Sequence, residues 1–240
     1  MRVLRALRAG SSWPVVAATA AGLFVVKLRG AAHGATALVA EIIVAELAER
    51  IGLQVPARVL IVLDEDLVSD DQNDELADLL AASHGVNLGF QFLAQAHDLK
   101  RSELETIDET TASRILWLDR LVMNPDRTDR NPNILMIGST PWLIDHGSSL
   151  YFHHSPGWEA EPARAHAAFP AIREHVLLGA ASQIPEQDAA MAAALTPDVI
   201  DEILALVPAE WPIDRAAYRR YFLERLAAPR AFVEEAVRAR

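Results

Sequence analysis

One short polar stretch of the sequence gathers the residue types that phosphoryl transfer requires. Residues 124–136 contain three Asn and two Asp, with prolines on either side of the polar core. Two apolar segments follow, and the second ends in Asp145-His146-Gly147. Transfer of a phosphoryl group from ATP needs a carboxylate that orients the acceptor hydroxyl. It also needs Asn and Asp oxygens that hold Mg²⁺ against the phosphates. The stretch and the turn together contain all of these groups.

The order and spacing of these groups follow the pattern of kinases. A kinase has a catalytic-loop Asp, an Asn five residues later, a short hairpin and then an Asp-x-Gly turn. Here Asp126 is followed five residues later by Asn131. Residues 134–137 and 142–144 predict a hairpin that delivers both metal ligands to one end. The alternative is a polar loop whose Asn, Asp and Pro residues only form turns. The ordered combination favours the functional interpretation.

Lys27 is an independent candidate. The chain contains twenty Arg but only two Lys, Lys27 and Lys100, and Lys27 lies in the otherwise apolar segment LFVVKL. A compact ammonium suits the binding of phosphate oxygens as a point charge, whereas a guanidinium is a larger, fixed fork. A buried Lys also needs a carboxylate partner. The following helix offers Glu41 and Glu46, and Glu41 is closer to the strand. The alternative places Lys27 on the exposed face of an edge strand.

A third candidate element precedes these residues. Gly10, Ser11 and Ser12 form a loop of small residues whose backbone N–H groups could bind phosphates. The sequence contains no Walker pattern and no GxGxxG, so an ordinary turn explains the loop equally well.

The N-terminal part of the sequence predicts a compact α/β unit. Residues 15–18 and 23–28 are β-prone and separated by a short turn, which favours an antiparallel hairpin. Residues 36–51 show helical periodicity, and Gly52 is a natural helix terminator. Residues 59–63 predict a further strand. These elements would position Lys27 and Glu41.

The rest of the sequence begins with an acidic segment and becomes mostly helical towards the C-terminal end. Residues 64–85 are acidic and indicate solvated surface, with a short helix at 74–82, while 86–93 predict an extended link. A helical pattern over 103–123 breaks at Asn124-Pro125, because a residue before proline is pushed out of the α region. The helical runs expected at the C-terminal end are residues 163–179, 185–195, 197–206, 214–227 and 229–239.

Composition limits the classes of partner. The net charge of −11 gives no uniform attraction for nucleic acid or anionic lipid, so neither is expected as a direct partner. The absence of Cys excludes disulfides and thiolate metal sites. No apolar run reaches the roughly 18 residues of a membrane span, and we expect a cytoplasmic protein. His146, His153 and His154 offer an alternative zinc site, but paired histidines without a third ligand are usually structural.

The motifs VVKL, NPDRTDRNPNIL and WLIDHGSSLYFHH, with a Glu41-bearing helix between the first two, resemble the HipA-like kinase family. This family is a bacterial branch of the protein-kinase-like superfamily. The similarity extends from about Arg8 to Pro156 and more loosely through the helical end. It implies an α+β, two-lobed protein-kinase-like fold, with a strand-rich N-lobe (1–85), a hinge (86–95) and a mostly helical C-lobe (96–240). ATP and Mg²⁺ would bind between the lobes.

The resemblance also implies roles for individual residues. Asp126 would be the catalytic base, Asp145 a metal ligand, and Lys27 the phosphate-binding lysine with Glu41 as its brace. The second metal ligand remains open between two residues. Asn131 has the five-residue spacing, whereas Asn133 has the Asn-Ile-Leu context typical of the position just before the strand.

The resemblance implies ATP-dependent phosphorylation of a hydroxyl acceptor, with a protein acceptor favoured. Better known relatives pair with a small DNA-binding antitoxin, but this chain is much shorter, so their partner-binding and substrate regions do not carry over. Three alternatives stay open: a nucleotide-binding pseudokinase without transfer activity, a helical interaction protein, and a metal hydrolase.

Overall fold

The computed structural model describes residues 1–7, 13–31, 33–65, 67–71 and 73–240. The chain separates into two compact units. The first comprises Met1–Leu38 and Pro56–Gln95, and the second comprises Val39–Val55 and Ala96–Arg240. Helix α1 (Gly34–Arg50) begins in the first unit and continues in the second.

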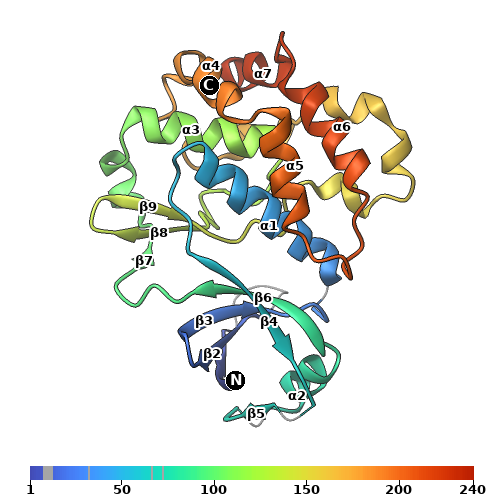
Figure 1. The fold of residues 1–240 in the computed structure, drawn as a ribbon. Helices are drawn as coiled ribbons and strands as arrows, with labels where there is room; N and C mark the ends of the chain where they lie inside the picture. Colours follow the sequence, from blue (N-terminus) through green and yellow to red (C-terminus); the bar gives the residue numbers. More distant parts are fainter. Residues whose placement is uncertain (8–12, 32, 66, 72) are drawn as a thin grey trace. The chain divides into compact units, whose positions relative to one another are not determined.

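The first unit is built on a six-stranded sheet in the order β4-β6-β3-β2-β1-β5 (Figure 1). Strands β1 and β5 pair in parallel, and the other neighbours pair antiparallel. The hairpin expected near residues 15–28 is confirmed as β2 and β3. The strands are β1 (Arg2–Ala6), β2 (Val15–Thr19), β3 (Gly22–Lys27), β4 (Arg58–Leu63), β5 (Val68–Ser69) and β6 (Gly85–Gln91).

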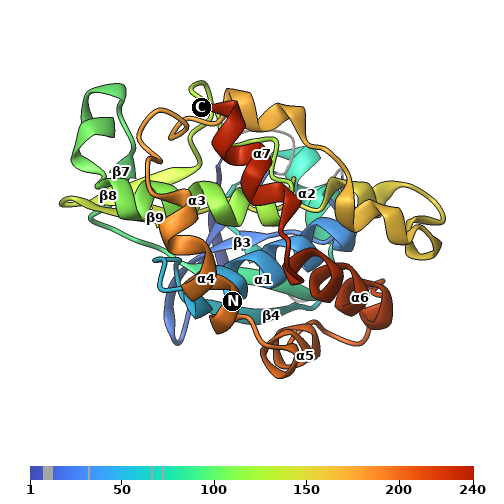
Figure 2. The same cartoon turned by 90° about the horizontal axis from the view of Figure 1, so that it is seen from above.

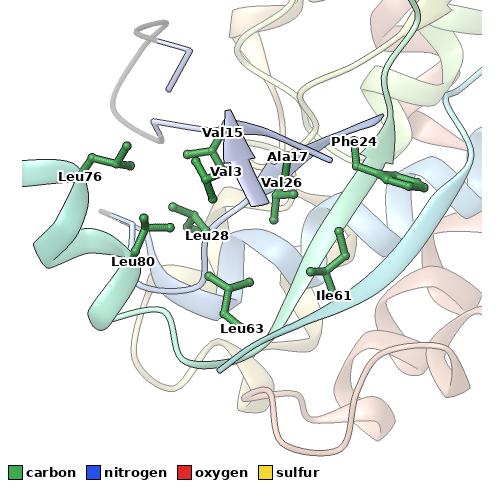
Figure 3. Close-up of a cluster of buried hydrophobic side chains, with 10 residues drawn as sticks. All are labelled: Val3, Val15, Ala17, Phe24, Val26, Leu28, Ile61, Leu63, Leu76 and Leu80. Atoms are coloured by element: carbon green, nitrogen blue, oxygen red, sulfur yellow. The ribbon is translucent and has the colours of Figure 1, made fainter. Parts of the chain in front are cut away.

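The apolar core of the first unit is formed by the sheet and helix α2 (Asp74–Ala81), as Figure 3 shows. Phe24 and Val26 of β3 point into this core together with Leu28 just beyond the strand. Because side chains alternate along a strand, Lys27 lies on the opposite face of the sheet. The core residues are Val3, Val15, Ala17, Phe24, Val26, Leu28, Ile61, Leu63, Leu76 and Leu80.

A buried amide holds the chain where it leaves β3. The Asn87 side chain is fully buried. Its Oδ1 accepts a hydrogen bond from the backbone N–H of Arg29 at 2.7 Å. Its Nδ2 donates to the carbonyl oxygens of Ser83 and Gly85, each at 2.8 Å. One side chain therefore fixes the segment that follows Lys27 against the turn before β6.

We expect Asn87→Ala to lower the free energy of unfolding by about 3 kcal/mol, because it leaves buried backbone groups without partners. Chemical denaturation would measure this loss. The matched control is Asn131→Ala, which removes an exposed amide and should change stability by less than about 0.5 kcal/mol. Equal stability of the two variants would contradict this interpretation.

The second unit combines a small antiparallel sheet, in the order β7-β8-β9, with the helices (Figures 1 and 2). Its strands are β7 (His97–Asp98), β8 (Ile134–Ile137) and β9 (Thr140–Leu143). Its helices after α1 are α3 (Glu109–Leu121), α4 (Ile184–Ala194), α5 (Pro197–Ala205), α6 (Arg215–Leu226) and α7 (Ala231–Ala239). Short 3₁₀ helices lie at Arg101–Thr106, Tyr151–His154, Trp158–Ala160, Pro162–His166 and Pro170–Glu174.

Helix α3 is the buried centre of the second unit. It packs against α4 and α7, and α7 crosses it in Figure 2. The Trp117 ring meets the Phe232 ring of α7 edge-on, with centroids 5.2 Å apart. The single helix expected over residues 103–123 is divided into the 3₁₀ helix Arg101–Thr106 and helix α3. The division occurs at Asp108, which caps the start of α3 by accepting a hydrogen bond from the Thr111 backbone N–H at 2.9 Å.

The prediction of a long helix over residues 163–179 is wrong. The chain forms two short 3₁₀ helices there, Pro162–His166 and Pro170–Glu174. Pro170 explains the interruption, because a proline disfavours the α region for the preceding residue. Phe169 accordingly has a non-helical backbone, with φ −134° and ψ 75°.

The lobe boundaries expected from the sequence remain a prediction. Most of the segment 86–93, expected as an extended link, forms β6, which pairs with β3 on one side and β4 on the other. Residues 39–55 group with the second unit, although the N-lobe was expected to span 1–85. Among the described residues, no helix has both the length and the hydrophobicity needed to cross a bilayer.

Candidate active site

A buried carboxylate anchors the polar loop that joins α3 to β8. Asp119 of α3 is fully buried and accepts hydrogen bonds from three side chains. Arg127 Nε lies 2.5 Å from Asp119 Oδ2, and His175 Nε2 lies 2.9 Å from the same oxygen. Asn124 Nδ2 donates to Oδ1 at 2.8 Å. The loop is therefore fixed to the helix by charge and by hydrogen bonds.

The charges in this cluster compensate one another. Burial alone would raise the pKa of Asp119, but Arg127 and His175 outweigh it and hold the pKa well below its usual value. Burial, together with the charge of Arg127, lowers the pKa of His175 below its usual value despite the opposing effect of Asp119. His175 is therefore neutral at pH 7. Its Nδ1 accepts the backbone N–H of Leu177 at 3.1 Å, so the proton lies on Nε2 and is donated to Asp119.

Arg127 connects the two ends of the loop. Besides Asp119, its guanidinium donates from Nη1 to the carbonyl oxygen of Asn133 at 2.5 Å. Its Nη2 lies 3.5 Å from His146 Nδ1. Its complete burial and these partners show that Arg127 braces the loop.

Asp126 is oriented within the loop by two amides. Its backbone N–H donates to Asn124 Oδ1 at 3.0 Å. Its carboxylate Oδ2 accepts from Asn133 Nδ2 at 3.2 Å. The residue is half-buried, whereas its neighbour Arg127 is fully buried. The carboxylate is thus held in one orientation while part of it stays accessible.

The two candidate amides for metal binding have different surroundings. Asn131 closes a tight turn with Thr128, through two reciprocal backbone hydrogen bonds of 3.1 Å, and is exposed. Asn133 is 8% exposed, lies directly before β8 and contacts Asp126. Only Asn133 is therefore built into the interior of the loop.

The β8–β9 hairpin brings Asn133 and Asp145 to the same end, as the sequence predicted. Ile134 pairs with Leu143 in the antiparallel register. The backbone N–H of Ile144 donates to the Asn133 carbonyl at 3.1 Å, which extends the pairing by one residue. Both Asn133 (φ 50°) and Asp145 (φ 57°) have left-handed backbone conformations. Asn and Asp tolerate this region better than most residues, and such strain concentrates at functional sites.

Glu41 holds the turn that carries Asp145. It lies on the part of α1 that belongs to the second unit and is 1% exposed. Its Oε2 accepts the backbone N–H of His146 at 2.9 Å, and its Oε1 accepts that of Gly147 at 2.7 Å. The sequence did not reveal this role, because Glu41 is more than a hundred positions away from His146 and Gly147. The bracing of Lys27 by Glu41 stays a prediction.

Lys27 is a buried residue of an internal strand. It ends β3, which lies between β2 and β6, and it is 8% exposed. Its Nζ lies 5.9 Å from the centroid of the Phe90 ring on β6. The alternative of an exposed edge-strand lysine is therefore wrong. The other residues predicted to bind phosphate, Gly10, Ser11 and Ser12, lie outside the described residues.

Of the three histidines near Asp145, His146 contacts Arg127, whereas His153 and His154 form a separate pair. His146 faces Arg127, whereas His153 Nδ1 lies 2.7 Å from the Tyr218 hydroxyl. His153 and His154 contact each other through their Nε2 atoms at 3.1 Å. Burial lowers the pKa of His153 to about 3, so it is neutral at pH 7. No group of three or more His, Asp or Glu side chains arranged for a metal ion is found within the described residues.

The sequence also missed Asp119 and His175. Asp119 left a visible signal, because it is a charged residue inside the apolar helical run ILWLDRLV. A charge at a buried position needs partners and therefore marks a polar cluster. No such signal exists for His175, which lies 56 residues away in an irregular segment.

Comparison with known proteins finds similarity to kinases in overall fold and in family. The crystal structure of a Helicobacter pylori proinflammatory kinase, CtkA, matches with a TM-score of 0.58 at 12% sequence identity. The match covers 98% of this chain and 93% of that chain, and at this identity it shows a common fold. Comparison with curated proteins finds no match. A family model described as HipA-like kinase matches residues 1–228.

Proposed function

Since this chain belongs to the HipA-like kinase family, we propose that it transfers the γ-phosphoryl group of ATP to a hydroxyl acceptor, with a protein as the favoured acceptor. One observation carries the proposal. The loop before β8 and the turn after β9 bring an oriented carboxylate, Asp126, together with an amide and a carboxylate, Asn133 and Asp145. These are the groups that phosphoryl transfer requires.

Asp126 is proposed as the catalytic base. The Asn133 amide donates to its Oδ2, which restrains the carboxylate, and the residue is accessible enough to meet a hydroxyl. The carboxylate would accept the hydroxyl proton as the acceptor oxygen bonds to the γ-phosphorus and the bond to the β-phosphate oxygen breaks. The products would be ADP and a phosphate monoester. The buried Asp119 and Arg127 keep the loop in place for this step.

Asn133 and Asp145 are proposed to hold Mg²⁺. Asn133 is preferred to Asn131 because Asn133 is buried beside Asp126, whereas Asn131 lies in an exposed turn. Amide and carboxylate oxygens are the hard donors that Mg²⁺ prefers. Mg²⁺ in nucleotide sites commonly uses only one or two protein groups, since phosphates and water complete its shell. A cluster of three acidic or His side chains is therefore not required. When bound, the ion would neutralise charge on the phosphates.

Lys27 is proposed to bind the α- and β-phosphates of the same nucleotide, with the loop containing Gly10, Ser11 and Ser12 supplying backbone N–H groups. Glu41 is proposed to support Lys27 as well as the Asp145 turn. We further propose a cytoplasmic enzyme, because its donor is ATP and its sequence contains no Cys. The acidic net charge of −11 argues against nucleic acid or anionic membranes as direct partners.

We expect Asn133→Ala to weaken Mg²⁺-dependent transfer by about 100-fold, because it removes a metal ligand and releases Asp126. Asn131→Ala is the matched control, since it removes the same amide from an exposed turn of the same loop. Initial rates at several Mg²⁺ concentrations would compare the two variants. If Asn131→Ala lost more activity than Asn133→Ala, the assignment of the metal ligand would be reversed.

The function itself is tested with the full chain, ATP and Mg²⁺. Calorimetry would measure ATP binding with and without the ion, and mass spectrometry would detect phosphorylation of the protein or of added Ser- and Thr-containing proteins. We expect Mg²⁺-dependent binding and transfer of phosphate. ATP binding without transfer above the level of Asp126→Asn would identify a pseudokinase. No ATP binding at all would reject the nucleotide site.

A further inference from the structure

Strand β4 forms one end of the six-stranded sheet of the first unit. It pairs with β6 on one side, and within the described residues no strand pairs with its other side. Its sequence, RVLIVL, contains no proline, its only charged residue is Arg58 at the start, and it pairs with β6 without a bulge. Proline, charged residues and bulges are the common means by which proteins protect a sheet edge from another strand. β4 is therefore largely unprotected along its edge.

The exposed side chains of β4 are apolar. Val59, Leu60 and Val62 are 36%, 51% and 63% exposed. Ile61 and Leu63, which alternate with Leu60 and Val62, point into the apolar core of the first unit (Figure 3). Because side chains alternate along a strand, Leu60 and Val62 lie on the other face of the sheet. Two neighbouring aliphatic side chains are thus in contact with water there, and covering them would be favourable.

The backbone of β4 presents hydrogen-bonding groups at the same edge. The backbone N–H of Gln91 donates to the carbonyl oxygen of Ala57, directly before β4, at 2.8 Å. In an antiparallel pair, alternate residues direct their N–H and C=O groups towards the partner strand. The odd-numbered residues of β4 therefore bond to β6. Leu60 and Val62 direct their backbone groups away from β6, where the described part of the chain supplies no partner.

We propose that β4 pairs with β4 of a second copy of this chain, antiparallel and centred on Ile61, to form a two-fold symmetric dimer. In this register Leu60 of one copy lies opposite Val62 of the other, and the symmetry repeats the pair. Each pair would exchange two backbone hydrogen bonds, because both residues direct their N–H and C=O groups outward. The exposed aliphatic side chains would then cover one another across the new strand pair.

Charge favours this register over the other symmetric ones. It places Arg58 opposite Asp64, the residue directly after β4, at both ends of the pairing. Opposite charges across a strand pair stabilise it. Asp64 is exposed and has no side-chain partner among the described residues. Arg58 donates from Nη1 to the Pro56 carbonyl at 3.3 Å, and a guanidinium with five N–H donors can bind a further acceptor. The neighbouring registers would place Arg58 opposite Val62, or Asp64 opposite Leu60.

Sedimentation of the full chain over a range of concentrations, at physiological ionic strength, tests the pairing. We expect a reversible equilibrium between monomer and dimer. Val62→Lys should weaken the dimer at least about tenfold, because a lysine on an edge strand opposes pairing with another strand. The matched control is Leu206→Lys, directly after α5, whose side chain is 49% exposed and should not affect the equilibrium. A monomer at every concentration, or equal dissociation of Val62→Lys and the wild type, would overturn the proposal.

Engineered cysteines test the register, because the native chain contains no Cys. Leu60→Cys and Val62→Cys are prepared separately and then mixed under oxidising conditions. In the proposed register the two sulfur atoms lie directly opposite each other only in the mixture, with Cα atoms about 5.5 Å apart, which suits a disulfide. We expect the mixture to cross-link at least about tenfold faster than either variant alone. Faster cross-linking of a single variant, or equal rates in all three samples, would contradict the register centred on Ile61.

Discussion

Replacing Asp126 with Asn should lower the rate of phosphoryl transfer by about 10²–10⁴-fold and leave the affinity for ATP and Mg²⁺ close to that of the wild type. The amide keeps the size of the carboxylate, and its single oxygen, Oδ1, can still accept the hydrogen bond from the Asn133 amide. It cannot take the proton of the acceptor hydroxyl. The loop should also keep its conformation, because its anchors are Asn124, Arg127 and Asp119.

The matched control is Asp129→Asn, which removes an exposed carboxylate three residues later in the same loop. Transfer rates by mass spectrometry and ATP affinity by calorimetry should be measured for both variants. We expect Asp129→Asn to behave as the wild type. Equal rates for Asp126→Asn and the wild type would contradict the assignment of the catalytic base. A parallel loss of ATP affinity would show that Asp126 acts in binding instead.

Asp119→Ala should lower the free energy of unfolding by about 3–5 kcal/mol, the largest stability effect that we expect in the chain. The substitution leaves the buried Arg127 without its counter-charge and removes the acceptor of His175 and Asn124. Chemical denaturation would measure the loss, with Asp129→Ala as the exposed control. A loss below about 1 kcal/mol would show that the cluster contributes little to stability.

The pH dependence of stability gives a second measurement of this cluster. The pKa of Asp119 in the folded chain is below its usual value near 4, so its contribution to stability is present above about pH 4 and is lost as the pH falls below that value. The pKa of His175 in the folded chain is below 6.5. Stability therefore falls as the pH drops below about 6.5, because the unfolded chain then binds a proton that the buried His175 does not. The stability difference between wild type and Asp119→Asn should therefore shrink below pH 4. A difference independent of pH in this range would contradict the lowered pKa.

Local patterns predicted the elements that hold the site. The β2–β3 and β8–β9 hairpins were predictable because each pairs β-prone segments across a short turn, and such pairing is decided within a few residues. Asp126 and the Asp145 turn were proposed from their order and spacing along the chain, and their roles remain predictions. The family resemblance on these motifs is confirmed over residues 1–228.

Partners from distant parts of the chain could not be predicted. Glu41 accepts the backbone N–H groups of the Asp145 turn across more than a hundred residues, and no local pattern encodes that pairing. The choice of Asn133 over Asn131 as the proposed metal ligand likewise depends on which of the two amides is buried. The five-residue spacing from Asp126, taken alone, pointed to Asn131. In the segment 163–179, where the sequence predicted a helical run, Pro170 interrupts the helix. Burial and proline geometry override local propensity in these cases.

The central claim is that Asn133, Asp145 and Lys27 act on one Mg²⁺-bound ATP. A crystal structure of the chain with a non-hydrolysable ATP analogue and Mg²⁺ tests it most directly. We predict that the metal contacts the side-chain oxygens of Asn133 and Asp145 and that Lys27 Nζ forms an ion pair with the phosphates of the same nucleotide. A nucleotide bound elsewhere, or a metal that contacts neither Asn133 nor Asp145, would contradict the claim.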